Sequence, residues 1–189
     1  MIFKKICIIG CGLIGSSLAR AIKKNKLAEK IVSSNRSEDI NKKVINLNIV
    51  DNSSSDTKKI VKDSDLIIIA TPLSSYKDVI LKIKTSLKNG AILTDVGSVK
   101  ENILSLVENH VPESVSWVPS HPIAGTEESG PEAGFSELFK NRWCILTPSK
   151  KAKKKDINLL KTFWEKIGSK VDIMEPKKHD YILSITSHL

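Results

Sequence analysis

The residues around His121 have the types needed for acid–base chemistry. His121 lies between Ser120 and Pro122 in the segment VPSHPIAGTEESGPEAGF, residues 118–135, which contains no lysine or arginine. The apolar residues before it predict a strand, so the imidazole should lie at a strand end. A neutral imidazole there can accept the proton of a hydroxyl group that is being oxidised. The alternative is a histidine that only hydrogen-bonds the backbone at a corner fixed by proline.

A glycine-rich turn near the N-terminus has the spacing of a dinucleotide-binding motif. GCGLIG, residues 10–15, follows a short apolar segment and leads into an amphipathic helical pattern. The first glycine allows the tight turn, the second lets a pyrophosphate approach the backbone, and the third lets helix and strand pack closely. The helix N-terminus attracts the anion, and a purely structural turn is the alternative. The residues expected to bind the cofactor here are Gly10, Gly12, Leu13, Ile14 and Gly15.

The end of the second expected strand should select the cofactor. NAD-binding domains place an acidic residue about 20 residues beyond the glycines, where it holds the ribose hydroxyls. This chain instead has Asn35, Arg36 and Ser37 after Ser34. Arg36 can bind a 2′-phosphate bidentately, and its neighbours can donate hydrogen bonds to it. We therefore favour NADP over NAD, with Arg36 stacked on the adenine of NAD as the alternative.

Two further strand ends should reach the same edge of the sheet. Thr71 and Pro72 follow an apolar segment and could line the nicotinamide-ribose side, or form a plain strand-to-helix turn. Ser98, in DVGSVK, could cap the next helix in a capping box with Glu101, or turn its hydroxyl toward a substrate. Ligands of open parallel sheets bind at the carboxyl ends of the strands.

Apolar strand-like segments alternate with helical patterns along most of the chain. This alternation predicts βαβ units in an α/β, Rossmann-type doubly wound and largely parallel sheet with helices on both faces. We assign residues 1–175 to this dinucleotide-binding domain. Helical patterns are expected near 13–22, 38–47, 75–87, 100–109 and 156–167. The expected strands are Ile6–Ile9, Ile31–Ser34, Leu66–Ala70, Ala91–Thr94, Val115–Val118, Trp143–Leu146 and Val171–Met174.

The last segment, residues 176–189, follows a different pattern. Tyr181, Ile185 and Leu189 recur at helical spacing, and no capping residue ends the pattern. We expect this helix to lead into a further helical domain that the chain lacks. His110 and His179 are expected at the surface.

Composition narrows the class of protein. The net charge is +9, and the densest basic run lies at residues 150–155. This run has no interleaved aromatic residues and no accompanying nucleic-acid motif, so a solvated loop is favoured over nucleic-acid binding. A positive potential that gathers small anions is a third interpretation.

The remaining features predict a cytoplasmic protein without a membrane partner. No apolar run reaches the roughly 18 residues of a membrane-spanning helix, and the N-terminus lacks the layout of a signal peptide. Cys7, Cys11 and Cys144 lie far apart in the sequence, which predicts reduced thiols and no metal site.

Taken together, the motifs resemble the cofactor-binding domain of the prephenate/arogenate (cyclohexadienyl) dehydrogenases. The resemblance rests on IIGCGLIGSSLARAI (8–22), DVGSVK (95–100), SHPIAGTEESGPEAGF (120–135), LFKNRWCILTP (138–148) and HDYILSITSHL (179–189). It implies an NAD(P)-dependent oxidative decarboxylation of tyrosine biosynthesis that needs no metal. It also implies an all-helical second domain, absent from this chain, that forms a homodimer, closes the site and supplies cationic partners for the anionic substrate.

The resemblance also implies roles for individual residues. His121 would be the proton acceptor, and Ser98 would orient that histidine and the substrate hydroxyl. Thr126 and Glu127 would lie at the mouth of the substrate pocket. Asp180 and His188 match the segment that leads into the second domain.

One departure from the family pattern concerns the cofactor. Many members have Asp where this chain has Asn35, which favours NADP further. Two other functions stay open: another NADP-dependent hydroxyacid dehydrogenase with a lysine base from the helical domain, and a module that senses NADP(H) without catalysis.

Overall fold

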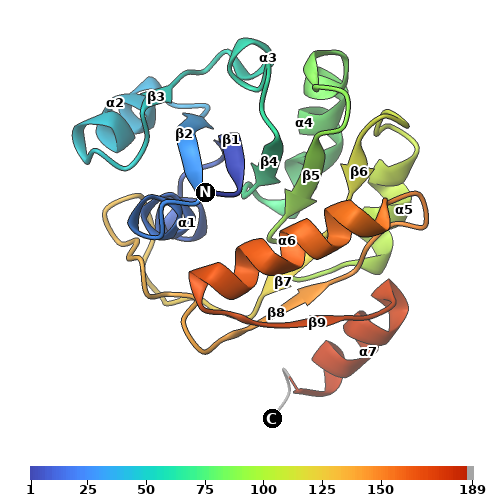
Figure 1. Cartoon of the computed structure of the whole chain (residues 1–189). Coiled ribbons are helices and arrows are strands. Elements are labelled where there is room, and N and C mark those ends of the chain that lie inside the picture. The colour runs from blue at the N-terminus through green and yellow to red at the C-terminus, as the bar shows by residue number, and fades with distance from the viewer. Residues whose placement is uncertain (187–189) are drawn as a thin grey trace.

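The structure is a computed structural model that describes residues 1–186 of the chain. Six strands form a parallel sheet in the order β3-β2-β1-β4-β5-β6, which runs from left to right in Figure 1. These strands are β1 (Phe3–Ile9), β2 (Ala28–Ser34), β3 (Asn52–Ser53), β4 (Leu66–Ile69), β5 (Ile92–Asp95) and β6 (Ser116–Trp117). The predicted Rossmann-type, doubly wound fold is confirmed. The strand order reverses between β1 and β4, and ligands of such sheets bind at this point.

The helices follow the strands in alternation. They are α1 (Leu13–Lys24), α2 (Glu38–Asn46), α3 (Thr57–Ile60), α4 (Tyr76–Ile83), α5 (Glu101–Glu108), α6 (Lys154–Ile167) and α7 (Pro176–Thr186). Short 3₁₀ turns, η1 (Leu73–Ser75) and η2 (Lys84–Ser86), flank α4. The sequence pattern missed α3 and β3 because each is too short to show a period.

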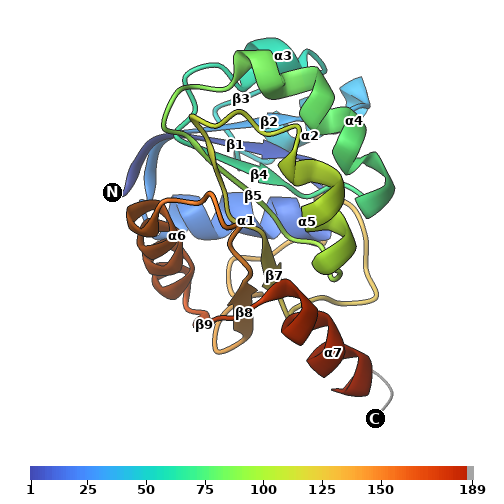
Figure 2. The ribbon, with the colours of Figure 1, turned by 90° about the vertical axis from the view of Figure 1, so that its right-hand side faces the viewer.

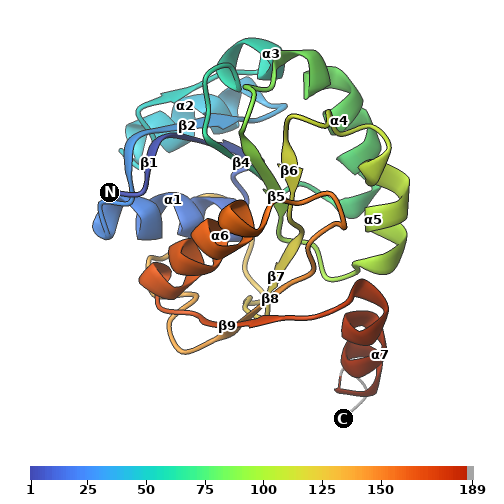
Figure 3. The ribbon, with the colours of Figure 1, turned by 45° about the vertical axis from the view of Figure 1, so that its right-hand side comes forward.

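The parallel sheet is buried on both faces, so its strands have continuous apolar runs. Ile6 and Ile8 of β1 pack with α1 and α6, whereas Cys7 and Ile9 of the same strand pack with α3, α4 and α5. Figure 3 shows α1 and α6 on one side of the sheet and α4 and α5 on the other. Alternate residues of one strand therefore enter two separate cores.

The later strands form a second sheet, which the sequence did not predict. It has the order β7-β8-β9 and comprises β7 (Ser120–Pro122), β8 (Trp143–Leu146) and β9 (Lys170–Ile173). β7 runs antiparallel to β8, and β8 runs parallel to β9. The period of a sequence predicts that a strand exists but does not say which strand pairs with it. His121 therefore lies within a short strand and does not simply follow one.

α7 projects from the rest of the fold, as Figure 2 shows, and its first turns contact α5. Tyr181 and Ile185 on this helix are exposed. No helix among residues 1–186 is long and apolar enough to cross a membrane.

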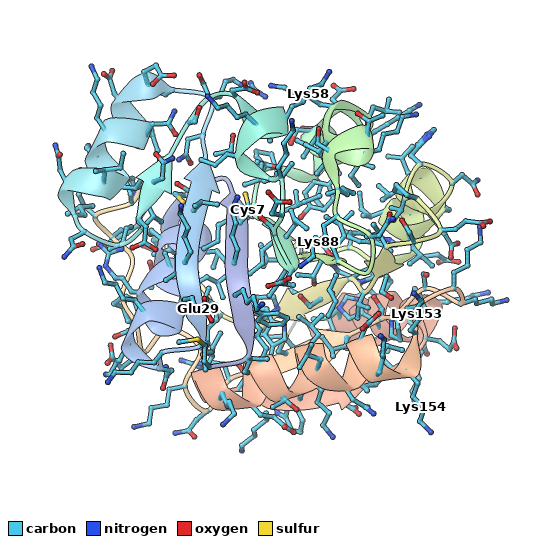
Figure 4. The ribbon with its side chains drawn as sticks, turned by 45° about the horizontal axis from the view of Figure 1, so that its top comes forward. Cys7, Glu29, Lys58, Lys88, Lys153 and Lys154 are labelled. Carbon is cyan, nitrogen blue, oxygen red and sulfur yellow. The ribbon has the colours of Figure 1, made fainter. Side chains whose placement is uncertain are left out.

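The lysines are spread over many elements. Lys58, Lys88, Lys153 and Lys154 lie on separate parts of the surface in Figure 4, the last two at the start of α6. Such a distribution favours solvated side chains over one basic patch. The three cysteines are buried and free.

Candidate functional site

A groove of about 570 Å³ lies at the carboxyl ends of β1, β2 and β4. It is formed by the predicted dinucleotide motif and by the strand ends beside it. Leu13, Ile14 and Gly15, which were also predicted to bind the cofactor, do not line it. The predicted residues that line the groove are Gly10, Gly12, Asn35, Arg36, Ser37, Thr71 and Pro72.

Each glycine of the turn is required for a different physical reason. Gly10 has φ +95°, and a Cβ there would lie 2.7 Å from the carbonyl oxygen of Ala70. A Cβ at Gly15 would overlap the carbonyl oxygen of Gly10, so Gly15 allows α1 to pack against the turn. A Cβ at Gly12 would meet nothing within 4 Å. Gly12 therefore leaves open space at the N-terminus of α1, where an anion would be stabilised by free N–H groups.

Replacing Gly12 with alanine is expected to raise the dissociation constant of a dinucleotide at least about tenfold without changing the melting temperature. The added methyl group would occupy the space in front of α1 that a pyrophosphate needs. Calorimetric titration and thermal unfolding measure the two effects. Gly125→Ala is the matched control, because its Cβ would also meet nothing within 4 Å but lies outside the groove. Equal affinities for Gly12→Ala and the unaltered protein would contradict the assignment.

Asn35 lines the groove, but its side-chain amide is hydrogen-bonded within a buried polar network. Its Oδ1 accepts a hydrogen bond from Cys11 N at 2.7 Å, which ties the tip of β2 to the glycine turn. Its Nδ2 donates to the oxygens of Asn41 and Ser53, at 3.1 and 3.2 Å. Asn41 in turn donates to the carbonyl of Asn35. The residue at the usual position of the ribose-binding acid therefore has a structural role, and its polar atoms are already paired.

No acidic residue lies at the end of β2, where the groove begins. Arg36 and Ser37 are exposed and line the groove, together with Ser55 and Lys82 from other segments. Burial raises the pKa of the Cys11 thiol to about 11, so this sulfur adds no negative charge beside the turn. The groove can accommodate an anionic group at this position.

The imidazole of His121 is half-buried next to the carboxyl end of β5. Its Nδ1 lies 2.9 Å from Nε2 of His179. No residue among 1–186 hydrogen-bonds its Nε2, and this nitrogen is not fully enclosed by the protein. Burial lowers the pKa of His121 from 6.5 to about 4, with smaller contributions from Lys100 and His179. The imidazole is therefore neutral near pH 7 and able to accept a proton.

The prediction that His179 lies at the surface is wrong. Its side chain is fully buried, with Nδ1 2.7 Å from Oδ1 of Asp180. Three side chains thus form a hydrogen-bonded series from the site to the start of α7: His121, His179 and Asp180. Sequence reasoning missed His179 because its burial depends on the contact of α7 with α5, which no local pattern reports. His110 is half-buried, and His188 lies outside the described residues.

A buried ion pair joins the strand of His121 to the main sheet. Lys100 Nζ lies 2.6 Å from Asp95 Oδ2 and 2.8 Å from the carbonyl oxygen of Ser120. Ser120 N donates to Asp95 Oδ1, and the Lys100 and Asp95 side chains are both fully buried. Burial lowers the pKa of Lys100, whereas the nearby Asp95 carboxylate raises it. These contacts fix the position of β7, and therefore of His121, relative to β5.

The other predicted site residues are exposed. Ser98 lies in the turn after β5, and Thr126 and Glu127 lie in the loop after β7. The proposed capping box of Ser98 and Glu101 is wrong. Lys100 is the N-cap residue of α5 and has no side-chain cap, and Asp180 accepts the free backbone N–H groups instead.

The loop after β7 folds back over α1 and reaches the groove. Arg20 donates to the carbonyl oxygen of Pro131 at 2.9 Å, and Phe135 N donates to Ser17 Oγ at 3.1 Å. Glu137 also pairs with Lys24 of α1, and Glu132 pairs with Lys43 of α2. Gly130 and Pro131 consequently line the groove. The segment that contains His121 therefore joins both parts of the site.

Comparisons with known proteins agree with this arrangement. A family model described as prephenate dehydrogenase, nucleotide-binding domain, matches residues 18–173. The cyclohexadienyl dehydrogenase of Zymomonas mobilis is 38% identical over 188 residues, which is 100% of this chain and 64% of that protein. This chain thus spans less than two thirds of that relative's length.

Solved structures give the same picture. Prephenate dehydrogenase from Aquifex aeolicus, in complex with hydroxyphenyl propionate and NAD⁺, has a TM-score of 0.92 and 32% identity, covering 98% of this chain and 64% of that chain. Synechocystis arogenate dehydrogenase has a TM-score of 0.91 and 27% identity, covering 97% of this chain and 64% of that chain.

Proposed function

The chain belongs to the prephenate dehydrogenase family, and from that premise we propose that it binds a nicotinamide dinucleotide and serves the oxidative decarboxylation of prephenate or arogenate. The observation that carries the proposal is the geometry of His121. Its Nδ1 is hydrogen-bonded by the buried His179, while its Nε2 has no partner among residues 1–186. The imidazole lies in the segment whose loop also lines the groove.

The residues of the groove fit such a cofactor. Gly12 leaves room for a pyrophosphate at the N-terminus of α1, and Thr71 and Pro72 lie across the switch point. A bound nicotinamide dinucleotide would supply the acceptor for the hydride that leaves ring carbon 4 of the substrate.

His121 would then handle the proton of the substrate. Its Nε2 would accept the proton of the ring hydroxyl as the hydride leaves. When the ring carboxylate departs as CO₂, its bonding electrons enter the ring, which becomes aromatic. The phenolate oxygen takes the proton back from His121, so no net proton is consumed. Ser98, exposed at the end of β5, would orient the hydroxyl, and Thr126 and Glu127 would lie at the entrance.

The direct test is an assay of the whole protein, with the helical region that is proposed to supply the substrate cations. Prephenate and arogenate are each tested with NADP and NAD, and reduction of the cofactor and release of CO₂ are followed together. Coupled appearance of both products supports the proposal. Reduction without CO₂ would point to a simple hydroxyacid dehydrogenase, and cofactor binding without turnover of either substrate would point to a sensing module.

We propose that NADP is preferred over NAD, with Arg36 and Ser37 as the 2′-phosphate ligands. Arg36→Ala should then raise the dissociation constant of NADP roughly 10- to 100-fold, because a charge-assisted hydrogen bond contributes about 1.5–3 kcal/mol. The dissociation constant of NAD should change less than about threefold. Parallel titrations with both cofactors measure this, with Lys58→Ala on α3 as a control for the loss of one surface charge. An unaltered protein that prefers NAD tenfold or more would exclude the proposal.

The pH dependence of turnover should follow the neutral form of His121. Because burial lowers its pKa to about 4, kcat/KM should be nearly constant between about pH 8 and pH 5. It should fall by up to about tenfold per unit below about pH 4, since a protonated imidazole accepts no proton. Lys100 and His179 also lower this pKa, and Asp180 raises it. A decline centred near pH 6.5, the ordinary value for histidine, would contradict a buried base.

We also propose that residues 1–175 are the dinucleotide-binding domain and that α7 leads into a helical region in the whole protein. That region would make a homodimer in the cytoplasm and supply cations for the substrate carboxylates. The exposed Tyr181 and Ile185 of α7 support this, as does the greater length of the relatives.

A further inference from the structure

We propose that His179 and Asp180 are positioning residues that hold His121 in the tautomer with its lone pair on Nε2. The inference rests on the proposed role of His121 as proton acceptor. It concerns which ring nitrogen carries the proton before the substrate binds. Three contacts on the path from α5 to His121 determine that state.

The first step is the state of the Asp180 carboxylate. Its Oδ1 accepts a hydrogen bond from Lys100 N and its Oδ2 accepts one from Glu101 N, both at 2.9 Å. These are free N–H groups at the start of α5, where a negative charge is favoured. Burial alone would raise the pKa of Asp180, but the hydrogen bonds from Glu101, His179 and Lys100 outweigh it and lower the pKa. The carboxylate is therefore ionised and can only accept hydrogen bonds.

The second step fixes the proton of His179. Its Nδ1 lies 2.7 Å from Oδ1 of Asp180, so Nδ1 must be the donor. A neutral ring with its proton on Nδ1 has its lone pair on Nε2. That lone pair faces Nδ1 of His121 at 2.9 Å, and the two rings meet edge to face. His121 Nδ1 consequently donates its proton to His179.

The third step follows for His121 itself. A neutral imidazole has one proton, and this one is on Nδ1, so Nε2 keeps its lone pair. Nε2 is the nitrogen without a partner among residues 1–186. An imidazole free in water prefers the opposite tautomer, with the proton on Nε2, and that form could not accept a proton at this position. The logic matches a catalytic triad, in which a carboxylate holds the histidine in its working tautomer.

The same series would stabilise His121 after it accepts the proton. The Lys100 ammonium disfavours a positive charge on His121, whereas Asp180 favours it. Because His179 connects Asp180 to His121, the charge of Asp180 can act on His121 through hydrogen bonds. The start of α7 is therefore coupled to the proposed base through two partly buried hydrogen bonds.

A nuclear magnetic resonance experiment tests the tautomer without any substrate. In protein labelled with ¹⁵N at histidine, the nitrogen shifts of His121 distinguish a protonated from an unprotonated ring nitrogen. We expect a protonated Nδ1 and an unprotonated Nε2 near pH 7. In His179→Leu, Nε2 of His121 should gain a proton in a large fraction of molecules. A protonated Nε2 in the unaltered protein, or no change in His179→Leu, would overturn the proposal.

Kinetics supply an independent readout. His179→Leu should lower kcat at least about tenfold while KM and the cofactor dissociation constant change less than about threefold. His179→Gln should recover most of kcat, because its amide oxygen can accept the Nδ1 proton of His121. Equal kcat values for the Leu and Gln variants, or a kcat for His179→Leu within twofold of the unaltered enzyme, would contradict a positioning role.

Two further variants keep the test decisive. If His179→Leu fails to fold, Asp180→Asn replaces it, because the loss of the carboxylate frees the tautomer of His179 and should also lower kcat. His110→Leu is the control for removing a half-buried histidine elsewhere and should leave kcat within about twofold. If the unaltered whole protein turns over neither substrate, the proposed function fails, whereas the spectroscopic result still decides the tautomer.

Discussion

Replacing His121 with asparagine is expected to lower kcat about 10²- to 10⁴-fold, the range contributed by a general base. Asparagine can still donate its amide N–H to Nε2 of His179, 2.9 Å from Nδ1 in the present structure. It has no basic nitrogen at the position of Nε2. The variant therefore removes the proton acceptor and keeps the hydrogen bond to His179.

The measurement is kcat and KM for prephenate or arogenate, with the cofactor dissociation constant as a check of the groove. That constant should stay within about twofold, because His121 does not line the groove. His110→Asn is the matched control and should leave kcat nearly unchanged. Retention of more than about a tenth of kcat in His121→Asn would mean that another residue takes the proton.

The parts of the site that sequence could predict are those that depend on local geometry. The glycine turn directly follows a strand and precedes a helix, and the role of Gly15 depends on its neighbours in sequence, Gly10 and Ile8. Arg36 could be placed because the end of a strand fixes which edge of the sheet it reaches. The Rossmann-type fold followed from the alternation of strands and helices for the same reason.

The parts that sequence could not predict depend on contacts between distant segments. His179 is charged or polar by type and stands near the start of a helix, which normally indicates the surface. It is buried because Asp180, its neighbour, caps α5 across 79 residues of sequence. The capping box of Ser98 and Glu101 failed for the same reason, since a cap can come from any part of the fold. Asn35 likewise matched a cofactor-binding position, yet its amide is satisfied by Cys11 and Asn41.

Replacing Lys100 with methionine is expected to destabilise the fold by roughly 3–5 kcal/mol, a large share of the stability of a typical domain. The Lys100 and Asp95 side chains are fully buried and 2.6 Å apart. Without the ammonium group, Asp95 keeps hydrogen bonds from Gly97 N and Ser120 N but loses its only described countercharge in contact. A buried unpaired carboxylate is unfavourable, whereas methionine fills most of the volume of the lysine stem, so the electrostatic part of the effect dominates.

Chemical denaturation measures the free energy of unfolding, and two variants separate the causes. Lys88→Met breaks the partly exposed pair with Asp65 and should cost only about 0–1 kcal/mol. The double variant Asp95→Asn with Lys100→Met removes both charges, and it should recover a substantial part of the loss, because an uncharged amide is less costly to bury. A Lys100→Met protein as stable as Lys88→Met would show that the buried pair contributes little. Since Lys100 also binds the carbonyl of Ser120, a Lys100→Met protein that folds should lose kcat as well. Ser120, the residue before His121, would lose the contact of its carbonyl with Lys100 and keep its other contacts to β5. A proton acceptor displaced by a fraction of an ångström is a poor one.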